Sequence, residues 1–485
     1  MRRSRWLAVA LAAVLLAGCR GKSPTATPPA PPAVTAPAQV RAATASPAAS
    51  PARVAQAATP APTPSPLPTP TPSPTPGPQP TPTPEPTPTP EPVPTPTPEP
   101  PPPPPPAPPP PPSASLPPVR IAPLRAGHIE YGFNAFLSGN PAEAGLNART
   151  MGNVREAGFG WVRVQLPWAD FEPAPGRYNT GPYDFIIGAA ASSGASVLVS
   201  VVKAPAWAAP ARPGALPQDT QAFGRTMRYL ASRYGAGVRA WEIWNEQNLA
   251  GEVGGSVDVA PYYETLKAGY TAVKAVTPGA VVLFGGLTPT GVLNPAVAID
   301  DTEYLRRFYS YANGEGRNYF DVLAAHPGSS ANPPEAKYPE NPGSGACPPV
   351  AVERYAAAPG SCWRDAPDFY FRRVEDQRAV MEAYGDGAKQ VWLTEFGWDA
   401  CVGLPAPSGY EYCALTSEQQ QAAYIVRAFA YARASWPWVG VMFLWNLNYA
   451  ATPNIARGDE KYGWSLLRGD WSHRPAYEAI KALPK

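Results

Sequence analysis

The chain has few of the residues that build metal or redox centres, and little apolar sequence that could cross a membrane. Of its 485 residues, three are His and five are Cys, and neither a Cys-x-x-Cys pair nor a His-rich cluster suggests a metal site. The formal net charge is +2, so nothing indicates nucleic acid or an acidic polymer as a partner. No segment beyond the N-terminal region approaches a transmembrane length. We therefore expect no metal centre, no nucleic-acid partner and no membrane-spanning domain.

The N-terminal residues have the pattern of a bacterial export signal. Arginines near the start precede an apolar run, 6–17, that is too short to span a bilayer. The run ends in Leu16-Ala17-Gly18-Cys19, which resembles the bacterial lipobox, where the signal is cut before a cysteine that then receives lipid. We expect residues 1–18 to be a lipoprotein signal peptide and Cys19 to be lipidated. The protein would then be held by lipid on the extracytoplasmic face of the cell membrane, or secreted if Cys19 merely follows an ordinary signal.

Proline dominates the following segment, 19–118. It consists mainly of Pro, Thr, Ala, Ser and Glu, and residues 100–112 are almost pure proline. Such a composition cannot bury enough apolar surface to offset chain entropy, so we expect a disordered linker. Proline favours extended geometry, which gives an upper reach of roughly 300 Å and the character of a semi-rigid stalk. A ligand for proline-recognising domains is the alternative, and it fits an exported bacterial protein poorly.

Four cysteines remain after Cys19, all in the C-terminal part of the chain. An even number of cysteines in an exported protein suggests disulfides. Pairing between near neighbours, Cys347 with Cys362 and Cys401 with Cys413, would brace two loops that are rich in Pro and Gly.

The remaining residues, 119–485, alternate short apolar segments with amphipathic ones and show no second linker. Nearly continuous runs of Val, Ile, Leu and aromatics are typical of parallel strands that are covered on both faces. The predicted strands are 128–134, 161–166, 196–202, 239–245, 280–286, 320–326, 390–396 and 439–446. The predicted helices are 147–157, 220–234, 261–276, 302–312, 368–384, 416–435 and 475–483, with Thr416 and Gln419 as a capping box.

This alternation predicts a (β/α)8 barrel. A doubly wound open sheet would show the same alternation, but no Gly-rich phosphate turn follows the first strand and the strand count reaches eight.

Two glutamates, Glu246 and Glu395, lie at the C-terminal ends of the fourth and seventh predicted strands. A buried charge is costly, so a carboxylate at such a position is hard to explain by stability alone. Catalytic groups of these barrels lie at the C-terminal ends of the strands, and both side chains would therefore line one mouth. Two facing carboxyl groups can cleave a glycosidic bond, because one protonates the leaving oxygen while the other attacks or stabilises the sugar carbon. No metal or organic cofactor is implied, since two carboxyls and water suffice.

Short motifs occur in the same order as the predicted strands. They are Arg163, Trp168, Glu172-Pro173, Gly176-Arg177-Tyr178, Pro205-Ala206-Trp207, Trp244-Asn245-Glu246, Thr394-Glu395-Phe396-Gly397 and Trp445. Together they resemble the clan of retaining (β/α)8-barrel glycoside hydrolases that includes the cellulase, β-xylosidase and β-galactosidase families. The resemblance covers essentially all of 120–485, and its details are most similar to the xylosidase/iduronidase-like and cellulase-like branches.

The resemblance implies a role for each matching residue. Glu246 would be the general acid/base, which must be protonated in the resting enzyme, and Glu395 would be the nucleophile. Asn245 would hydrogen-bond the sugar 2-hydroxyl, and Arg163 would keep Glu395 ionised and oriented. Trp445 would form an apolar platform under the sugar, and the resemblance also makes Trp207 a candidate sugar contact. Simpler interpretations remain for some of these residues: Arg163 could be a core cation, and the tryptophans could be packing.

His326 ends the sixth predicted strand, where relatives often place a His-x-Tyr motif at the active-site rim. Here the match fails, because His326-Pro327-Gly328 lacks the tyrosine. Tyr449 or Tyr338 could replace it, or its function could be absent. The insert 327–368 and the loop between Cys401 and Cys413 follow the sixth and seventh strands, so both would border the cleft.

The expected function is that of a retaining glycosidase acting on β-linked oligo- or polysaccharides by double displacement, as a monomer with a carbohydrate substrate. Two other classes stay open: a barrel that binds sugar without catalysis, and a purely structural surface protein. Retention of both glutamates with Asn245 argues against the first, and the second leaves the paired carboxylates unexplained. Glu242 is expected to be paired inside the barrel rather than to act in catalysis.

Overall fold

The computed structural model describes residues 128–340, 347, 362–452 and 455–485. They belong to the second of the two units into which the chain divides, Glu99–Lys485. The signal peptide 1–18, the lipidation site Cys19 and the linker 19–118 lie outside the described residues, and these expectations stay predictions.

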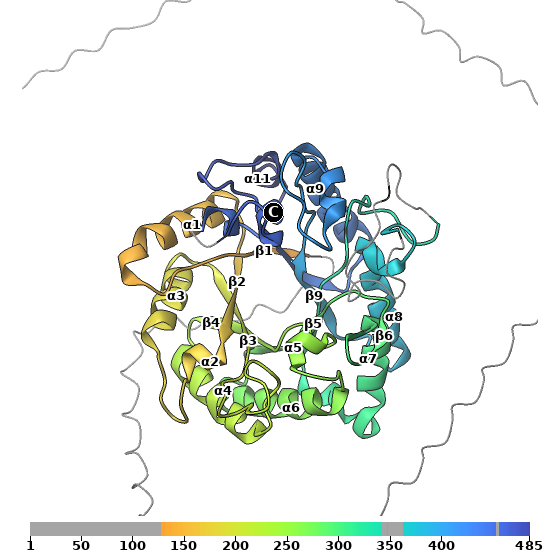
Figure 1. Cartoon of the computed structure of the whole chain (residues 1–485). Helices are drawn as coiled ribbons and strands as arrows, with labels where there is room; N and C mark the ends of the chain where they lie inside the picture. The colour runs from red at the N-terminus through yellow and green to blue at the C-terminus, as the bar shows by residue number, and fades with distance from the viewer. Residues whose placement is uncertain (1–127, 341–346, 348–361, 453–454) are drawn as a thin grey trace, which may run out of the picture. The chain divides into compact units, whose positions relative to one another are not determined.

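Eight parallel strands close into a barrel in the order β1-β10-β9-β8-β5-β4-β3-β2 (Figure 1). They correspond one by one to the eight predicted strands, so the predicted (β/α)8 fold is confirmed. The strands are β1 (Glu130–Asn134), β2 (Trp161–Pro167), β3 (Ser196–Val202), β4 (Val238–Ile243), β5 (Val281–Leu287), β8 (Val322–Ala325), β9 (Gln390–Phe396) and β10 (Val439–Leu444). Two short strands, β6 (Leu293–Asn294) and β7 (Ala298–Ile299), pair antiparallel in the connection after β5.

A ring of helices surrounds the barrel, with at least one helix after each barrel strand (Figure 1). These helices are α1 (Ala144–Glu156), α3 (Gly181–Ser192), α4 (Thr220–Tyr234), α6 (Val259–Val276), α7 (Asp301–Ser310), α8 (Val374–Ala383), α9 (Glu418–Ser435) and α11 (Pro475–Lys481). Short helices α2 (Trp168–Phe171), α5 (Ala250–Val253) and α10 (Glu460–Trp464) lie in the connections after β2, β4 and β10. Within the described ranges, no helix has the length and apolarity to cross a bilayer.

Three helical details differ from prediction. The helix α3 was not predicted, and its sequence shows why: it opens with Gly181-Pro182 and contains Gly188 amid alanines, which weakens its periodic pattern. The predicted helix 368–384 begins only at Val374, because the preceding residues form two 3-10 turns.

The third difference concerns the cap of α9. Ser417 and Gln420 make the capping box, one residue later than the predicted Thr416 and Gln419. Both pairs have the required spacing, and the structure buries Thr416 instead.

Inside the barrel, side chains from alternate strands form stacked layers. The lowest layer is apolar, with the rings of Trp161 and Trp392 edge-to-face at 5.1 Å and Phe443 beside them. Toward the C-terminal end of β2, the successive inward-facing residues are Trp161 in this layer, then buried Arg163, and then exposed Gln165. Along the barrel axis, the interior therefore changes from a hydrophobic layer to a layer with a buried ion pair, and then to an open mouth.

Candidate active site

A cavity of about 230 Å³ opens at the C-terminal ends of the barrel strands. Five of the predicted site residues line it: Asn245, Glu246, His326, Glu395 and Trp445. They come from β9 and from the connections that follow β4, β8 and β10, so four separate parts of the chain meet here. This is the position at which barrels of this type carry their functional groups.

Glu246 lies three residues beyond the end of β4, where the backbone turns sharply. Trp244 and Glu246 both have positive φ angles, 71° and 50°, a region that side-chain-bearing residues rarely occupy. The Glu246 N–H donates to the carbonyl of Gly286 at 2.8 Å, and the Trp244 N–H donates to the carbonyl of Val201 at 3.0 Å. These bonds to the neighbouring strands hold the unusual turn and place the Glu246 carboxyl at the cavity.

Glu395 is the penultimate residue of β9, and its side chain is 16% exposed. Its Oε1 accepts a hydrogen bond from Arg163 Nη1 at 2.7 Å. Burial raises the pKa of Glu395 above its usual value, while the positive charges of His326 and Arg163 work against that rise. Arg163, and His326 when it is protonated, therefore favour the ionised carboxylate in a place where burial disfavours it.

Arg163 is buried beneath the cavity and connects four side chains. Its Nε donates to Glu242 Oε2 at 2.7 Å, and Nη1 donates to Asn134 Oδ1 at 2.8 Å as well as to Glu395. Its Nη2 donates to Asn245 Oδ1 at 2.8 Å, which leaves the amide NH₂ of Asn245 as the part that can donate to a ligand. Arg163 is thus both a core cation and a partner of Glu395.

Glu242 is fully buried, in agreement with the expectation of a partner inside the barrel. Besides Arg163, it accepts hydrogen bonds from the Thr394 hydroxyl at 3.0 Å and from the Gly286 N–H at 3.2 Å.

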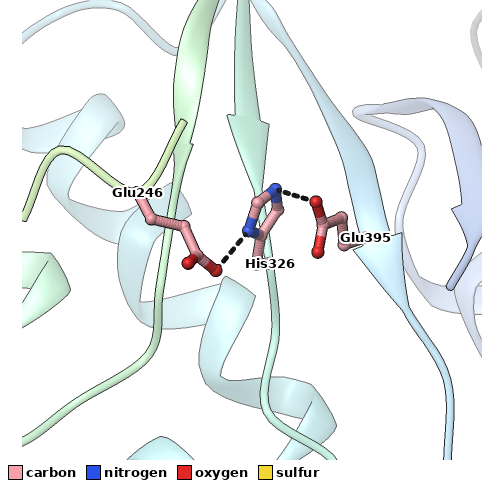
Figure 2. A group of neighbouring side chains, drawn as sticks. All are labelled: Glu246, His326 and Glu395. Carbon is pink, nitrogen blue, oxygen red and sulfur yellow. Dashed lines mark hydrogen bonds and ion pairs between the residues drawn. The ribbon is translucent and has the colours of Figure 1, made fainter. Parts of the chain in front are cut away.

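His326 lies between the two glutamates (Figure 2). Its Nδ1 is 3.0 Å from Glu246 Oε1, and its Nε2 is 3.0 Å from Thr394 Oγ1 and 3.8 Å from Glu395 Oε1. Since the Thr394 hydroxyl donates its hydrogen to Glu242, its oxygen accepts from Nε2–H, and Nδ1 is left to share a proton with Glu246. Burial alone would lower the pKa of His326, but the charge of Glu395 and the bond to Glu246 outweigh it and raise that pKa.

One side-chain oxygen of Glu246, one of Glu395 and a ring nitrogen of His326 all lie within 4.8 Å of one another. Such a group could in principle hold a metal ion. However, Glu395 is already in contact with the guanidinium of Arg163, and both ring nitrogens of His326 face protein oxygens. A second cation would be repelled by the first, so the arrangement suits a carboxylate pair better than a metal centre.

The two predicted disulfide pairings, Cys347 with Cys362 and Cys401 with Cys413, are present. The insert 327–368 and the loop between Cys401 and Cys413 both contribute described residues to the cavity lining, as expected. Three lining residues in the connections after β8 and β9 were not singled out by the sequence, namely Phe369, Tyr410 and Tyr412. Gln165, Glu460 and Trp464 also line the cavity and were not predicted. For Gln165 a signal existed, since it shares the inward face of β2 with Arg163.

Trp207 is not among the described residues that line this cavity. Its indole N–H donates to the carbonyl of Glu172 at 2.9 Å, and its ring packs edge-to-face on Trp168 at 5.3 Å. A contact between Trp207 and sugar stays a prediction.

Of the two tyrosines considered as replacements, Tyr449 packs against Trp445 at 5.1 Å. Burial, together with the charge of Glu395, raises the pKa of Tyr449 to about 12. Tyr338 packs against Tyr370, 6.0 Å between ring centroids, and does not line the cavity.

No family model matches the sequence, and no curated protein matches it. Among solved structures, a family 39 glycoside hydrolase from Bacteroides cellulosilyticus WH2 matches 73% of this chain with 22% identity and a TM-score of 0.50. This chain covers 62% of that enzyme's length. Xylanase 10B from Thermotoga maritima matches 73% of this chain and 94% of its own, with 15% identity and a TM-score of 0.47. A family 39 enzyme from Xanthomonas axonopodis pv. citri matches 74% of this chain and 65% of its own, with 17% identity and a TM-score of 0.46.

At 22% identity, the similarity to the Bacteroides cellulosilyticus enzyme is evidence about the fold alone. The chain has the (β/α)8-barrel fold that is found in glycoside hydrolases.

Proposed function

We propose that the protein is a retaining glycoside hydrolase that cleaves β-linked oligo- or polysaccharides. The observation that carries the proposal is the approach of Glu246 and Glu395 to within 4.8 Å across the cavity. Retaining enzymes hold their carboxyl groups about 5 to 5.5 Å apart, whereas inverting enzymes need roughly 6.5 to 9.5 Å to admit a water molecule. The separation therefore favours direct attack by a carboxylate on the sugar.

The surroundings of the two glutamates support different roles for them. Glu395 is in contact with Arg163 and close to His326, so it is the better placed to act as the ionised nucleophile. Glu246 shares a proton with Nδ1 of His326 and is the group that protonates the leaving oxygen. Once Glu395 is esterified its charge is lost, and Glu246 takes a proton from the water that releases the sugar.

Asn245 and Trp445 complete the proposed sugar site. The amide NH₂ of Asn245, oriented by Arg163, donates to a sugar hydroxyl beside Glu395. The half-buried indole of Trp445 offers an apolar surface to the ring. The two disulfides fit a protein that works outside the cytoplasm. We also propose that a lipid on Cys19 anchors the protein to the membrane.

The test is hydrolysis of a panel of aryl β-glycosides and β-linked oligosaccharides, with the anomer of the first product identified by NMR. The unmodified protein should release the β-anomer first, and Glu395→Gln should lose activity while remaining folded. Glu315→Gln is the matched control, because Glu315 is an exposed glutamate in the segment that leads into the opposite end of β8. Inversion of the product, or full activity in Glu395→Gln, would contradict the proposal.

A further inference from the structure

Three aromatic side chains form one wall of the cavity, and none of them belongs to a barrel strand. Phe369 lies in the connection after β8, and Tyr410 and Tyr412 lie in the connection after β9. We refer to Phe369, Tyr410 and Tyr412 as the aromatic wall. The proposed catalytic residues come from the strand ends, whereas this wall comes from the loops beyond them.

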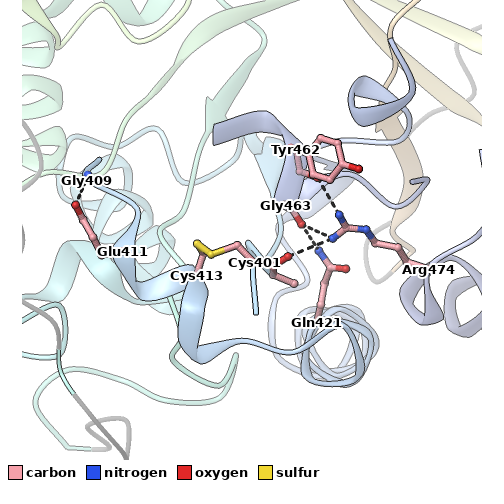
Figure 3. The surroundings of a disulfide bond; sticks show 9 residues. Cys401, Gly409, Glu411, Cys413, Gln421, Tyr462, Gly463 and Arg474 are labelled. Carbon is pink, nitrogen blue, oxygen red and sulfur yellow. Dashed lines mark hydrogen bonds between the residues drawn. A yellow bond between two sulfur atoms is a disulfide. The ribbon is translucent and has the colours of Figure 1, made fainter. Parts of the chain in front are cut away.

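The Cys401–Cys413 disulfide closes the loop that carries both tyrosines (Figure 3). Within it the Cys401 N–H donates to the carbonyl of Cys413 at 3.1 Å, and the Cys413 N–H donates to the carbonyl of Tyr410 at 2.9 Å. The Gly409 N–H donates to Glu411 Oε1 at 3.0 Å. These bonds determine the path of the backbone on both sides of Tyr410.

The start of this loop is also fixed to the body of the barrel. Buried Arg474 donates through Nη1 to the carbonyls of Ala400, at 3.4 Å, and Gly463, at 2.8 Å (Figure 3). Gly463 belongs to α10, the helix that carries Trp464 of the cavity lining.

The connection after β8 packs against the tyrosine-bearing loop. Phe369 forms a buried cluster with Trp363, and Tyr412 and the disulfide-bonded Cys347 pack against that cluster. The connection after β8 and the Cys401–Cys413 loop therefore both contribute to the aromatic wall and pack against each other.

Two further aromatic residues, Trp445 and Trp464, also line the cavity. Strands follow in the order β8, β9, β10 around the barrel, and Trp445 and Trp464 come from the connection after β10. Sugar rings present apolar C–H faces, which aromatic side chains cover, while polar groups determine orientation. Asn245, Glu246, His326 and Glu395 lie at the strand ends where the reacting sugar is proposed to bind, whereas the aromatic wall lines the cavity from the loops beyond them.

We propose that the aromatic wall is a subsite for the sugar unit next to the one that is cleaved, and that the Cys401–Cys413 disulfide sets the position of its tyrosines. This inference rests on the proposed function and deepens it, because it makes the substrate an oligosaccharide chain. The wall then contributes binding to the chain and leaves the chemistry at Glu246 and Glu395 unchanged.

The experiment compares two substrates of the same sugar: a β-linked oligosaccharide of at least three units and the β-glycosyl fluoride, whose leaving group cannot reach the wall. The full-length protein, Tyr410→Ala, Tyr410→Phe and the double variant Cys401→Ser/Cys413→Ser are assayed on both. For the oligosaccharide, Tyr410→Ala and the double variant should lower kcat/KM by about tenfold, mainly through KM. For the fluoride the change should stay below about twofold, and Tyr410→Phe should behave like the unmodified protein on both substrates.

The outcomes separate the two proposals. An equal loss on both substrates, or no loss on the oligosaccharide in Tyr410→Ala, would overturn the subsite while leaving the glycosidase assignment intact. Hydrolysis of neither substrate by the unmodified protein would overturn the proposed function and the subsite with it. Tyr410→Ala keeps the test decisive if the double variant fails to fold, which its circular dichroism would reveal.

Discussion

Replacement of Arg163 by methionine should lower the free energy of unfolding of the barrel and also impair the proposed reaction. The two effects can be measured separately. The guanidinium is buried and makes ion pairs of 2.7 Å with both Glu242 and Glu395. Glu242 is fully buried and has no other cation in contact among the described residues. Arg163→Met therefore leaves an uncompensated charge inside the protein.

Breaking a buried pair by removing one partner costs roughly 3 to 5 kcal/mol of unfolding free energy. The double variant Arg163→Met/Glu242→Gln removes the stranded charge as well, and should recover most of that loss. The matched control is Arg225→Met, because Arg225 is exposed and its ion pair with Asp219 is 3.4 Å long. We expect that control to change stability by less than about 0.5 kcal/mol.

Activity should not recover in the double variant, because Glu395 still lacks its guanidinium. Burial already raises the pKa of Glu395, and loss of the Arg163 charge raises it further. The nucleophile must be ionised, so activity is lost as the pH falls through this pKa, and the acidic limb of the pH–rate profile should move to higher pH. Urea unfolding and a pH profile of kcat measure the two effects. Equal stability of Arg163→Met and the unmodified protein, or full activity of the double variant, would contradict the proposed role of Arg163.

Three further predictions concern single residues. Burial raises the pKa of Asp368 to about 7, so folding favours its neutral form and stability falls as pH rises from about 4 to 7. Asp368→Asn should therefore match the unmodified protein at pH 4 and gain up to about 4 kcal/mol at pH 8 in urea unfolding; a gain of the same size at both pH values would contradict this. His326→Gln removes the imidazole between Glu246 and Glu395, and should lower kcat on the order of 100-fold and move the acidic limb to higher pH, as measured by a pH–rate profile. Glu172→Ala removes the buried acceptor of the Trp168 indole and the Gly176 N–H, and should cost about 3 kcal/mol by chemical denaturation, with the exposed Glu315→Ala as control.

The barrel was predictable because its strands carry a strong local signal. Each is nearly continuous in Val, Ile, Leu and aromatics, as burial on both faces requires, so the eight strands could be counted without knowledge of their neighbours. α3 has no such signal, since its alanines and Gly188 are held in place by the barrel rather than by their own periodicity. The cap of α9 was predicted one residue early because Thr416 and Ser417 are each followed by a glutamine three residues later.

The floor of the candidate site was predictable because Glu246, His326 and Glu395 lie at or just beyond strand ends whose order the fold dictates, and because the resemblance placed Arg163, which lies inside β2, beside Glu395. Its walls were not. Phe369, Tyr410 and Tyr412 reach the cavity through loop conformations that depend on disulfides and on packing between segments far apart in the sequence. Trp207 was singled out by its motif; its ring packs on Trp168 and its indole N–H donates to the carbonyl of Glu172, and its contact with sugar stays a prediction.

The positive φ angles at Trp244 and Glu246 have an evolutionary consequence. Left-handed backbone at such residues costs on the order of 1 kcal/mol each, and glycine or asparagine would adopt it with less strain. Replacement of Glu246 by either residue would thus relax the backbone while removing the proposed proton donor. Without selection for hydrolysis, the backbone angle at position 246 would favour substitution of the glutamate by glycine or asparagine. The conformation of this turn therefore gives no reason of its own to keep a glutamate there.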